Sequence, residues 1–464
     1  DKDGDLDLAV GNYATGWYRR TPGEEARNRI VFNEGGALTG EKFQELPGLP
    51  GDTLTMLLTD IDLDGNLDLL EGNDFEIPDI FSMGDGAGGF TPIRRADGII
   101  PETTTTTMAM KTADLHNDGV PEIYVAQIAG RSSGVHNLKV RDIEAYCDGI
   151  ERPEDLATCQ KNMAIKRWYK SGHSFDPSYA GRCLEFEGRY RDECKGMLVK
   201  DLAIQNRDPS LCGLIPVNQP RAKQLCEIHF LPFRQPAQAE VDETIPQILR
   251  RNVLLVRQED GTYAEEAVKQ GLQVGGWSWD TKVVDADNDG WQDVYIVNGT
   301  WVPNEITPSN LFYRNKGDGT FEEVSGPFGL EDYLMTAAAA AFDFENDGDV
   351  DFLTVPVNGP VMAFVNNAAA GNTIAFAFED RVGNRFGIGN RIEIRNGAGK
   401  QTRELQLGGG FMSFDAPVAY FGLGEYDTVD SVAINWSNGG TTTIETPLPA
   451  GALYRIAREP AATR

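Results

Sequence analysis

An Asp-rich loop with a central glycine occurs five times in this chain, and each copy runs directly into an apolar, β-rich segment. The clearest copy occupies residues 60–68 (DIDLDGNLD), where Gly65 allows the sharp turn that brings the acidic side chains together. Hard oxygen ligands in a flexible loop suit Ca²⁺, whereas Mg²⁺ requires tighter octahedral geometry and Zn²⁺ prefers His or Cys. The loop predicts a calcium site with side chains from positions 1, 3, 5 and 9 and a backbone carbonyl from position 7: Asp60, Asp62, Asp64, Asp68 and Asn66.

Three further complete copies keep this spacing. In chain order, their expected ligands, with the carbonyl donor of position 7 named fourth in each set, are Asp114, His116, Asp118, Val120 and Glu122; Asp285, Asp287, Asp289, Trp291 and Asp293; and Asp343, Glu345, Asp347, Asp349 and Asp351. The copy with His116 at position 3 is weaker, because imidazole is a poor ligand for Ca²⁺.

The remaining copy opens the chain. Aligning Gly4 with Gly65 puts Asp1, Asp3, Asp5 and Asp7 at positions 3, 5, 7 and 9. Position 1 would then precede the first residue. We therefore expect the sequence to be a fragment or a processed form of a longer protein, and we expect about five calcium sites.

A single loop of this kind would be weak evidence, since an acidic glycine turn between two strands is also ordinary solvated hairpin chemistry. Five copies in register favour metal binding. The acidity of the chain fits this interpretation, because 71 Asp and Glu against 42 Lys and Arg give a formal net charge of −29. Without metal the clustered carboxylates repel one another, so calcium should contribute folding energy. The negative charge also argues against nucleic acid as a partner.

The spacing of the loops predicts the fold. The motif glycines at 4, 65, 119, 290 and 348 are separated by 61, 54, 171 and 58 residues, so three of the four steps are nearly equal. A period of this length filled with short strands and turns is typical of a β-propeller with one blade per repeat. A second marker supports the period: residues 310–321 (NLFYRNKGDGTF) read as strand, turn and strand, with weaker copies beginning at Asn252 and Asp79.

The long step indicates an insertion within one blade. Gly119 lies 133 residues before Asn252, whereas Gly290 lies 20 residues before Asn310. We place the insertion at residues 139–245, which contain all six cysteines: Cys147, Cys159, Cys183, Cys194, Cys212 and Cys226. Charged, helix-favouring residues surround them, so we expect a small helical subdomain with three disulfides. Neighbours in sequence are the simplest pairs, although six cysteines formally allow 15 connectivities.

The alternative for these cysteines is a zinc or redox site. No CxxC occurs, and adjacent cysteines are at least ten residues apart, which disfavours both. Oxidised cysteines together with calcium indicate a protein that works outside the cytoplasm, secreted or at the cell surface. No run reaches the ~18 apolar residues of a membrane span.

The acidic loops and the residue 310–321 segment resemble FG-GAP/VCBS repeats, the blades of integrin-α-like propellers. From Val382 onward the succession GNRFGIGNRI, GGGFMSF, YFGLG and VAINWSNG is similar to the ASPIC/UnbV domain, which follows such propellers in the cartilage acidic protein family. Two positions depart from that family: Asn390, where Gly-Ala is frequent, and Phe414, where Gln often follows the serine. The resemblance implies a seven-bladed ring whose first blades precede Asp1, and a secreted, calcium-dependent binding or matrix protein.

The expected organisation is therefore mainly β, with propeller blades at residues 1–138 and 246–372 interrupted by the helical insertion at 139–245. Residues 373–464 form a separate β-sandwich or barrel, because alternating runs such as residues 391–395 are joined by Asn-Gly turns.

For function we expect no enzyme but an adhesion or scaffold protein, with a protein or glycan partner at the cell surface or matrix, and in one variant a self-assembling filament subunit. The alternative is a secreted, calcium-dependent propeller hydrolase or lyase acting on polysaccharide. Residues 130–134 (GRSSG) match the GxSxG string of hydrolases, but no helix clearly follows them and a propeller lacks the required parallel sheet.

Overall fold

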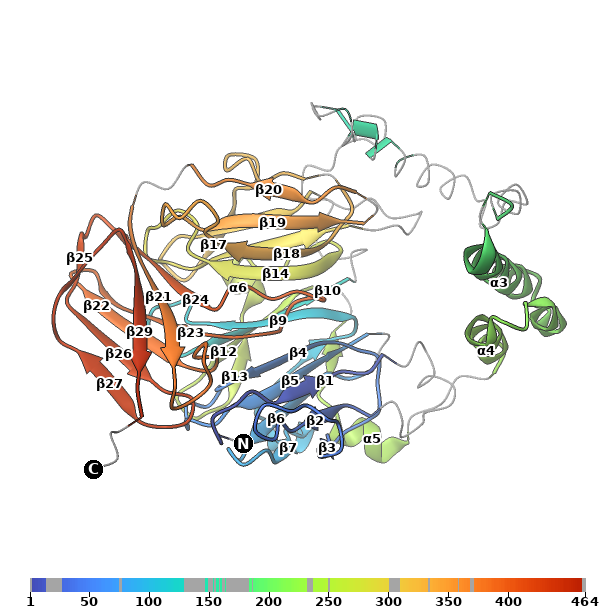
Figure 1. Cartoon of the computed structure of the whole chain (residues 1–464), viewed down its shortest axis with the longest axis horizontal. Coiled ribbons are helices and arrows are strands. Elements are labelled where there is room, and N and C mark those ends of the chain that lie inside the picture. Colours follow the sequence, from blue (N-terminus) through green and yellow to red (C-terminus); the bar gives the residue numbers. More distant parts are fainter. Residues whose placement is uncertain are drawn as a thin grey trace.

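The computed structural model is dominated by antiparallel sheets (Figure 1). It describes residues 2–13, 27–74, 77–128, 147–148, 183–185, 187–231, 237–248, 251–299, 309–332, 334–357, 359–367 and 371–460, with residues 153, 156, 157, 159, 160 and 163. Among these residues, no helix is long and apolar enough to cross a membrane.

Five antiparallel sheets follow one another along the chain before residue 365, and within each sheet the strands are arranged in chain order. Their strands are β1 (Leu8–Val10), β2 (Arg29–Val31) and β3 (Phe43–Glu45); β4 (Thr53–Thr59), β5 (Asp68–Asn73), β6 (Ile80–Gly84) and β7 (Phe90–Pro92); β9 (Thr107–Ala113), β10 (Glu122–Gln127), β12 (Val253–Arg257) and β13 (Tyr263–Glu265); β14 (Ser278–Val284), β15 (Asp293–Asn298), β16 (Leu311–Asn315) and β17 (Phe321–Glu323); β18 (Thr336–Phe342), β19 (Asp351–Pro356) and β20 (Met362–Phe364).

Each complete acidic loop joins the first and second strands of its sheet. The second strand follows the loop at once, and in β5, β10 and β15 every residue is buried. Buried side chains then pack between successive sheets. Leu57 and Phe81 meet Met110 between the second and third sheets, and Tyr295 meets Phe352 between the fourth and fifth.

The first strands β4, β9, β14 and β18 contact one another in that order. The second to fifth sheets therefore stack in sequence order with their first strands adjacent. Stacked separate sheets agree with consecutive blades, but closure into a propeller stays a prediction.

The second sequence marker fastens the third strand of a sheet to the second. The Oδ1 atom of Asn310, just before β16, accepts the backbone N–H of Asn298 at 2.8 Å. Asn252, just before β12, accepts the N–H of Gln127 in the same way at 3.1 Å. Asp79 does so for Asn73 at 2.8 Å. In these three sheets, the first residue of the marker accepts the backbone N–H at the end of the second strand, so the marker satisfies the same backbone donor each time.

The insertion separates β10 from β12, which nevertheless pair as antiparallel neighbours with Ile123 opposite Leu255. A short parallel pair, β8 (Thr103–Thr104) with β11 (Gln247–Ile248), lies at its return. The helices of the described chain are η2 (Arg95–Asp97), α3 (Gly188–Asn206), η5 (Pro209–Leu214), α4 (Pro220–His229), α5 (Gln238–Glu243) and α6 (Ala267–Gln270). Four of these, α3, η5, α4 and α5, belong to the predicted helical insertion.

Three disulfides join neighbouring cysteines, Cys147–Cys159, Cys183–Cys194 and Cys212–Cys226, which is the pairing expected from the sequence. The last bridge ties η5 to α4 and lies in a small apolar core with Ala203, Ile215 and Ala222. With so little apolar surface to bury, a subdomain of this size depends on such covalent links.

The C-terminal domain begins with β21 (Asn372–Asp380), close to the predicted boundary at residue 373. Its two main sheets have the strand orders β24-β21-β29 and β23-β22-β26-β27 around one apolar core. The remaining strands are β22 (Arg391–Asn396), β23 (Gly399–Glu404), β24 (Val418–Gly424), β25 (Thr428–Val429), β26 (Ser431–Asn435), β27 (Thr441–Ile444), β28 (Leu448–Pro449) and β29 (Ala452–Arg458).

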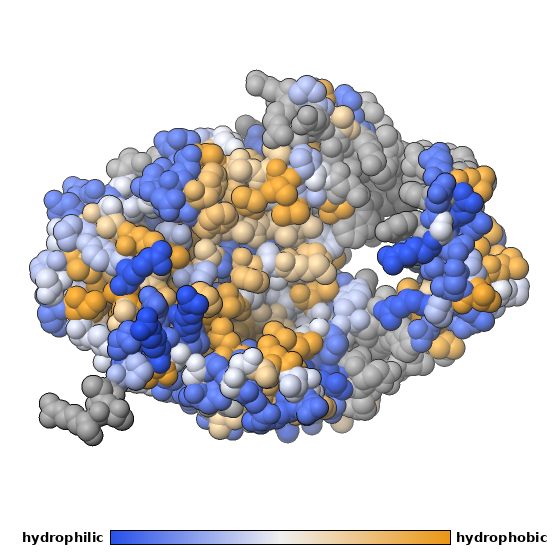
Figure 2. All heavy atoms as spheres, viewed as in Figure 1, coloured by the Kyte–Doolittle hydropathy of each residue, from blue (hydrophilic) through white to orange (hydrophobic). Residues whose placement is uncertain are grey.

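The C-terminal domain lies along one side of the stack of sheets, and α3 and α4 lie on the opposite side (Figure 1). On the face shown in Figure 2, hydrophobic residues gather over the middle of the molecule while hydrophilic residues dominate its outer parts.

Candidate metal centres

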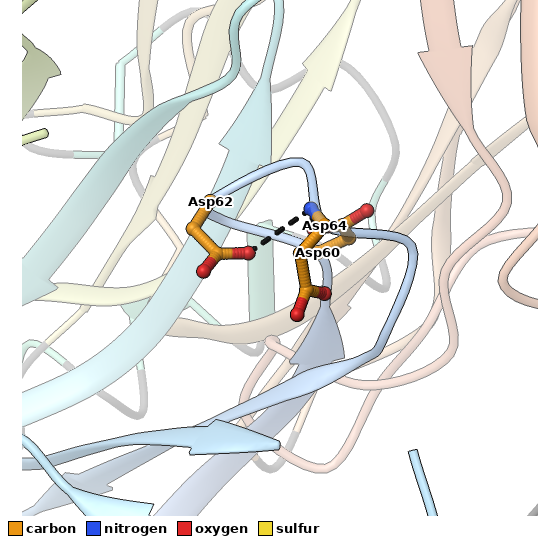
Figure 3. A group of neighbouring side chains, drawn as sticks. All are labelled: Asp60, Asp62 and Asp64. Carbon is orange, nitrogen blue, oxygen red and sulfur yellow. Dashed lines mark hydrogen bonds between the residues drawn. The ribbon is translucent and has the colours of Figure 1, made fainter. Parts of the chain in front are cut away.

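The Asp60 loop brings three carboxylates together, as Figure 3 shows. Oxygen atoms of Asp60, Asp62 and Asp64 all lie within 4.8 Å of one another. The backbone N–H of Asp64 donates to Asp60 Oδ1 at 3.2 Å and to Asp62 Oδ1 at 3.1 Å. Gly65, with φ +87°, closes the turn and donates its N–H to Asp60 Oδ2 at 3.0 Å. The turn therefore orients three hard oxygen donors toward one point.

The Asp285 loop has the same construction. Asp285, Asp287 and Asp289 form the second group of three carboxylates within 4.8 Å, and these two groups are those found in the described part of the chain. Asp285 accepts the N–H of Asp289 at 3.1 Å and that of Gly290 at 2.9 Å. A buried oxygen, Asp287 Oδ1, has no hydrogen-bond partner among the described residues, as expected of a ligand atom that faces a cation.

A basic side chain already lies against this second group. Arg314, from β16, contacts Asp287 at 2.5 Å and Asp289 at 3.0 Å. It belongs to the second sequence marker, residues 310–321, which the loop spacing does not connect to the site. The signal in the sequence is a basic residue within a marker that follows the loop in the same repeat.

Burial and mutual repulsion disfavour the ionised forms of these carboxylates. Burial, followed by the charges of Asp289 and Asp287, raises the pKa of Asp285 to about 7 although Arg403 opposes this. Burial also raises the pKa of Asp60, with repulsion from Asp62 and Asp64 adding to it. A bound divalent cation would favour the ionised forms. Both groups therefore fit calcium by the chemistry of their donors.

The Asp114 loop keeps the backbone geometry but not the group of three. Asp114 accepts the N–H groups of Asp118 at 2.9 Å and Gly119 at 3.0 Å. His116 instead turns to Glu122, with 2.9 Å between Nδ1 and Oε1. The hydrogen bond to Glu122 is the main cause that raises the pKa of His116 to about 9. An imidazolium therefore occupies the position that a carboxylate holds in the stronger loops.

The last and first loops show no group of three facing carboxylates among their described residues. In the last, Asp343 accepts the N–H of Gly348 at 2.9 Å, but Glu345 and Asp347 do not join it in a group of three described carboxylates. The side chain of Asp349 accepts a hydrogen bond from Asn288 of the preceding loop at 2.7 Å. In the first, Asp3 Oδ1 accepts the N–H of Asp5 at 3.2 Å, and Asp1 lies outside the described residues.

The acidic residue at position 9 has a different role in every loop where it is described. Its carboxylate accepts backbone N–H groups from position 2 of the loop, from a residue at or just beyond the end of the second strand after the loop, or from both. The pairs are Asp68 with Ile61 (2.9 Å) and Gly84 (2.8 Å), Asp293 with Ala286 (3.0 Å) and Asn315 (2.8 Å), Asp351 with Phe344 (3.0 Å) and Asn366 (2.8 Å), Glu122 with Leu115 (2.8 Å), and Asp7 with Asn33 (2.8 Å).

Position 9 thus fastens the loop to its sheet. The structure does not place these carboxylates in the two groups of three. Ligation by Asp7, Asp68, Glu122, Asp293 and Asp351 stays a prediction, as does that by the carbonyls of Asp5, Asn66, Val120, Trp291 and Asp349.

A cavity of about 420 Å³ lies where the loops meet the C-terminal domain. Asp60, Asp114 and Asp285 line it from one side, and Arg403 and Glu404 from the other. Arg403 is buried, and its guanidinium lies over the ring of Phe421 at 4.9 Å. The electrostatic environment of the loops therefore includes residues more than 100 positions away, which no local motif could reveal.

Of the other candidates, the GxSxG string at residues 130–134 lies outside the described residues. In β14, Trp279 donates Nε1–H to the Gly299 carbonyl at 2.6 Å. Asp280 is fully buried and lies 3.3 Å from Lys282.

Residues 381–464 match the family described as ASPIC and UnbV. This stretch comprises β22 to β29, including the part of the domain that faces the acidic loops. The match agrees with the resemblance seen in the sequence at the C-terminus.

Two curated relatives share the name cartilage acidic protein 1. The protein of Xenopus tropicalis is 40% identical over 63 residues, which are 13% of this chain and 10% of that protein. The human protein is 27% identical over 165 residues, or 34% of this chain and 25% of that protein. The matched part of the chain therefore spans a quarter or less of each relative.

The solved structure of the V. cholerae biofilm matrix protein Bap1 aligns with 96% of this chain and 56% of that one, at 10% identity and a TM-score of 0.30. A TM-score this low supports no conclusion about a shared architecture.

Proposed function

We propose that this chain is part of an extracellular calcium-binding scaffold or adhesion protein, in which calcium stabilises a propeller of the FG-GAP/VCBS type. The observation that carries the proposal is the pair of loops whose three carboxylates converge within 4.8 Å. The three disulfides and the similarity to cartilage acidic protein 1 support an oxidising, extracellular setting.

In this proposal calcium has a structural role. The carboxylates of Asp60 and Asp285 also accept backbone N–H groups of their own loops, so each loop would be closed around the ion. Such a site favours rigidity over an exchangeable coordination position for a substrate. The partner would be a protein or glycan of the cell surface or matrix, held by surfaces other than the loops.

Calorimetric titration of the chelator-treated chain with CaCl₂ tests the metal. We expect at least two strong sites, with MgCl₂ binding far more weakly. Calcium at a hundredfold excess over the dissociation constant stabilises by about 2.7 kcal/mol per site. The midpoint of thermal unfolding should therefore rise clearly on adding calcium and fall in EDTA. A melting curve unaffected by EDTA and calcium would contradict the proposal.

The enzymatic alternative makes a separate prediction. A panel of acidic and neutral polysaccharides incubated with the chain should show no degradation in the presence of calcium. Turnover that disappears with chelator and returns with calcium would replace the scaffold proposal by a calcium-dependent hydrolase or lyase.

A further inference from the structure

The acidic loops are also the surface against which the C-terminal domain rests. In the Asp285 loop, the backbone N–H of Gly422 donates to Asp285 Oδ2 at 3.1 Å, and that of Gly424 donates to the Asn288 carbonyl at 2.8 Å. Both donors belong to β24. One strand of the C-terminal domain is thus hydrogen-bonded to two residues of a candidate calcium loop.

The preceding two loops are held in the same way. The guanidinium of Arg391, in β22, donates to the carbonyl of Gly119, which is the turn glycine of the Asp114 loop. The hydroxyl of Thr59, directly before the Asp60 loop, donates to Glu404 Oε2 at 2.6 Å. These contacts come from different strands of the domain, so docking depends on the relative positions of several loops.

The last loop completes the surface. The backbone N–H of Asp343, its position 1, donates to the hydroxyl of Tyr420 at 3.3 Å. All four complete loops therefore contact the domain, either within the loop or at the residue directly before it.

A single oxygen links the loop conformation to the docked domain. Asp285 Oδ2 accepts the N–H of Gly290, which closes the loop at 2.9 Å, and also the N–H of Gly422. The space around Gly422 is full, because a Cβ there would collide with Asp285 Oδ2 and the backbone of Asn288. If repulsion between uncompensated carboxylates opens the loop, the bond to Gly422 is lost as well.

We propose that calcium binding by the acidic loops and docking of the C-terminal domain are thermodynamically coupled. Calcium holds the loops in the conformation to which the domain docks, and the docked domain in turn raises the affinity of the loops for calcium. Such coupling is necessarily reciprocal. The inference rests on the calcium binding of the proposed function, but a calcium-binding chain without this coupling is a distinct outcome.

A second attachment allows docking to be weakened without altering any loop. Residues 408–410, the glycine segment, run between β4 and β9. Gly409 donates its N–H to the Met56 carbonyl at 2.8 Å and accepts the N–H of Met110 at 2.8 Å. A Cβ on Gly409 would collide with the Met110 carbonyl oxygen.

Buried charges next to this segment fix its position. Asp415, which follows it in the chain, lies 3.3 Å from Lys282 and 3.7 Å from Lys111. Lys111 also donates to the Gly408 carbonyl at 2.9 Å. The segment has little room to shift, so a side chain at Gly409 should displace the C-terminal domain itself.

The first experiment is hydrogen exchange of the full chain with calcium and with EGTA. Removing calcium should speed exchange of the Gly422 and Gly424 amides at least tenfold, while amides of β26 inside the domain keep their protection. Equal exchange of the two glycine amides in both conditions, in a chain shown to bind calcium, would overturn the coupling.

The second experiment uses Gly409→Ala, with Gly451→Ala as the matched control. Both glycines have left-handed backbones, φ +72° and +77°, but nothing lies within 4 Å of a Cβ on Gly451. The docking variant should bind calcium about tenfold more weakly, within the usual range of such couplings, and the control should bind like the parent chain. Calcium affinity unchanged in Gly409→Ala would overturn the proposal.

Arg391→Gln provides a readout if Gly409→Ala does not fold. It removes the contact with Gly119 from a half-buried position, and should weaken calcium binding several-fold in titrations of a folded chain. If the parent chain and both variants bind calcium with the same affinity, the coupling is contradicted and the proposed calcium binding is not. Failure of the parent chain to bind calcium contradicts the proposed function as well.

Discussion

Carboxylates lie near both ends of β5, clustered and partly exposed at one end and buried at the other. At the end that follows the acidic loop, Asp60, Asp62 and Asp64 face one another within 4.8 Å. Beyond the other end, Asp79 is alone and 2% exposed. It accepts the N–H of Asn73 at 2.8 Å, the hydroxyl of Thr107 at 2.8 Å and the hydroxyl of Thr103.

This difference distinguishes a cation site from a buried carboxylic acid whose oxygen atoms all have hydrogen-bond donors. Burial raises the pKa of Asp68, beside the loop, and that of Asp79 to about 7 alike. The raised pKa therefore identifies neither as a metal site. The distinguishing feature is whether several carboxylate oxygens face each other, as in the loop, or each oxygen faces a donor, as at Asp79.

The Asp114 loop is an intermediate case. Its third position is His116, which pairs with buried Glu122 and brings a positive charge into the loop. The same backbone turn thus occurs with an expected calcium ion in one repeat and with an imidazolium in another. Three predictions test this view, beginning with the largest effect.

The first prediction concerns pH and Asp79. The folded chain keeps the Asp79 proton up to about pH 7, whereas the unfolded chain loses it near the ordinary value of 3.8. Since the folded state binds more protons in that window, the free energy of unfolding falls as pH rises through it and levels off above pH 7. Asp79→Asn should remove about 3 kcal/mol of the decline between pH 5 and pH 8.

Urea unfolding of the parent chain and Asp79→Asn in saturating calcium measures this effect. Parallel pH profiles for the two chains would show that Asp79 is ionised in the folded state, and the contrast between the two ends of β5 would be lost.

The second prediction concerns the loop end. Asp62→Asn keeps the Oδ1 acceptor for the N–H of Asp64 but removes one charge from the group of three. It should abolish one equivalent of calcium binding and about 2.7 kcal/mol of calcium-dependent stability at a hundredfold excess over the dissociation constant. Asp79→Asn is the matched control, since it makes the same chemical change outside the loop. Titration and calcium-dependent melting of the two variants check the difference, and equal losses in both would argue against a site at Asp62.

The third prediction converts the intermediate loop. His116→Asp should add one calcium equivalent in calorimetry, because it supplies the missing carboxylate at position 3. In EDTA the variant should be about 1–2 kcal/mol less stable, since buried Glu122 loses its partner and gains a negative neighbour. A chain with no additional calcium equivalent would show that position 3 is not what separates the Asp114 loop from the Asp60 loop.

Local features of the fold followed from the sequence. The runs after the acidic loops are β1, β5, β10, β15 and β19. The neighbouring cysteines pair. All of these depend on turn chemistry, strand alternation or short chain separations, which act within about ten to fifteen residues.

Features of the site that depend on residues far apart in the chain were not predicted from the sequence. Nothing in the spacing placed Arg314 against Asp287, turned His116 toward Glu122 and Gln270, or assigned position 9 to backbone donors. The contact between Gly422 and Asp285 joins residues 137 positions apart. Their proximity depends on how the sheets and the C-terminal domain pack.

The repeated acidic turns, their positions and the side chains that each could offer to a cation can be recognised from the sequence alone. Each turn needs a left-handed backbone at the position of its glycine, a conformation that glycine adopts without strain, so the pattern is readable locally. Which turns keep three carboxylates facing one another, and which domain covers them, depends on tertiary packing. The charges and donors that make this difference arrive from other strands, and long-range packing alone brings them within hydrogen-bond distance.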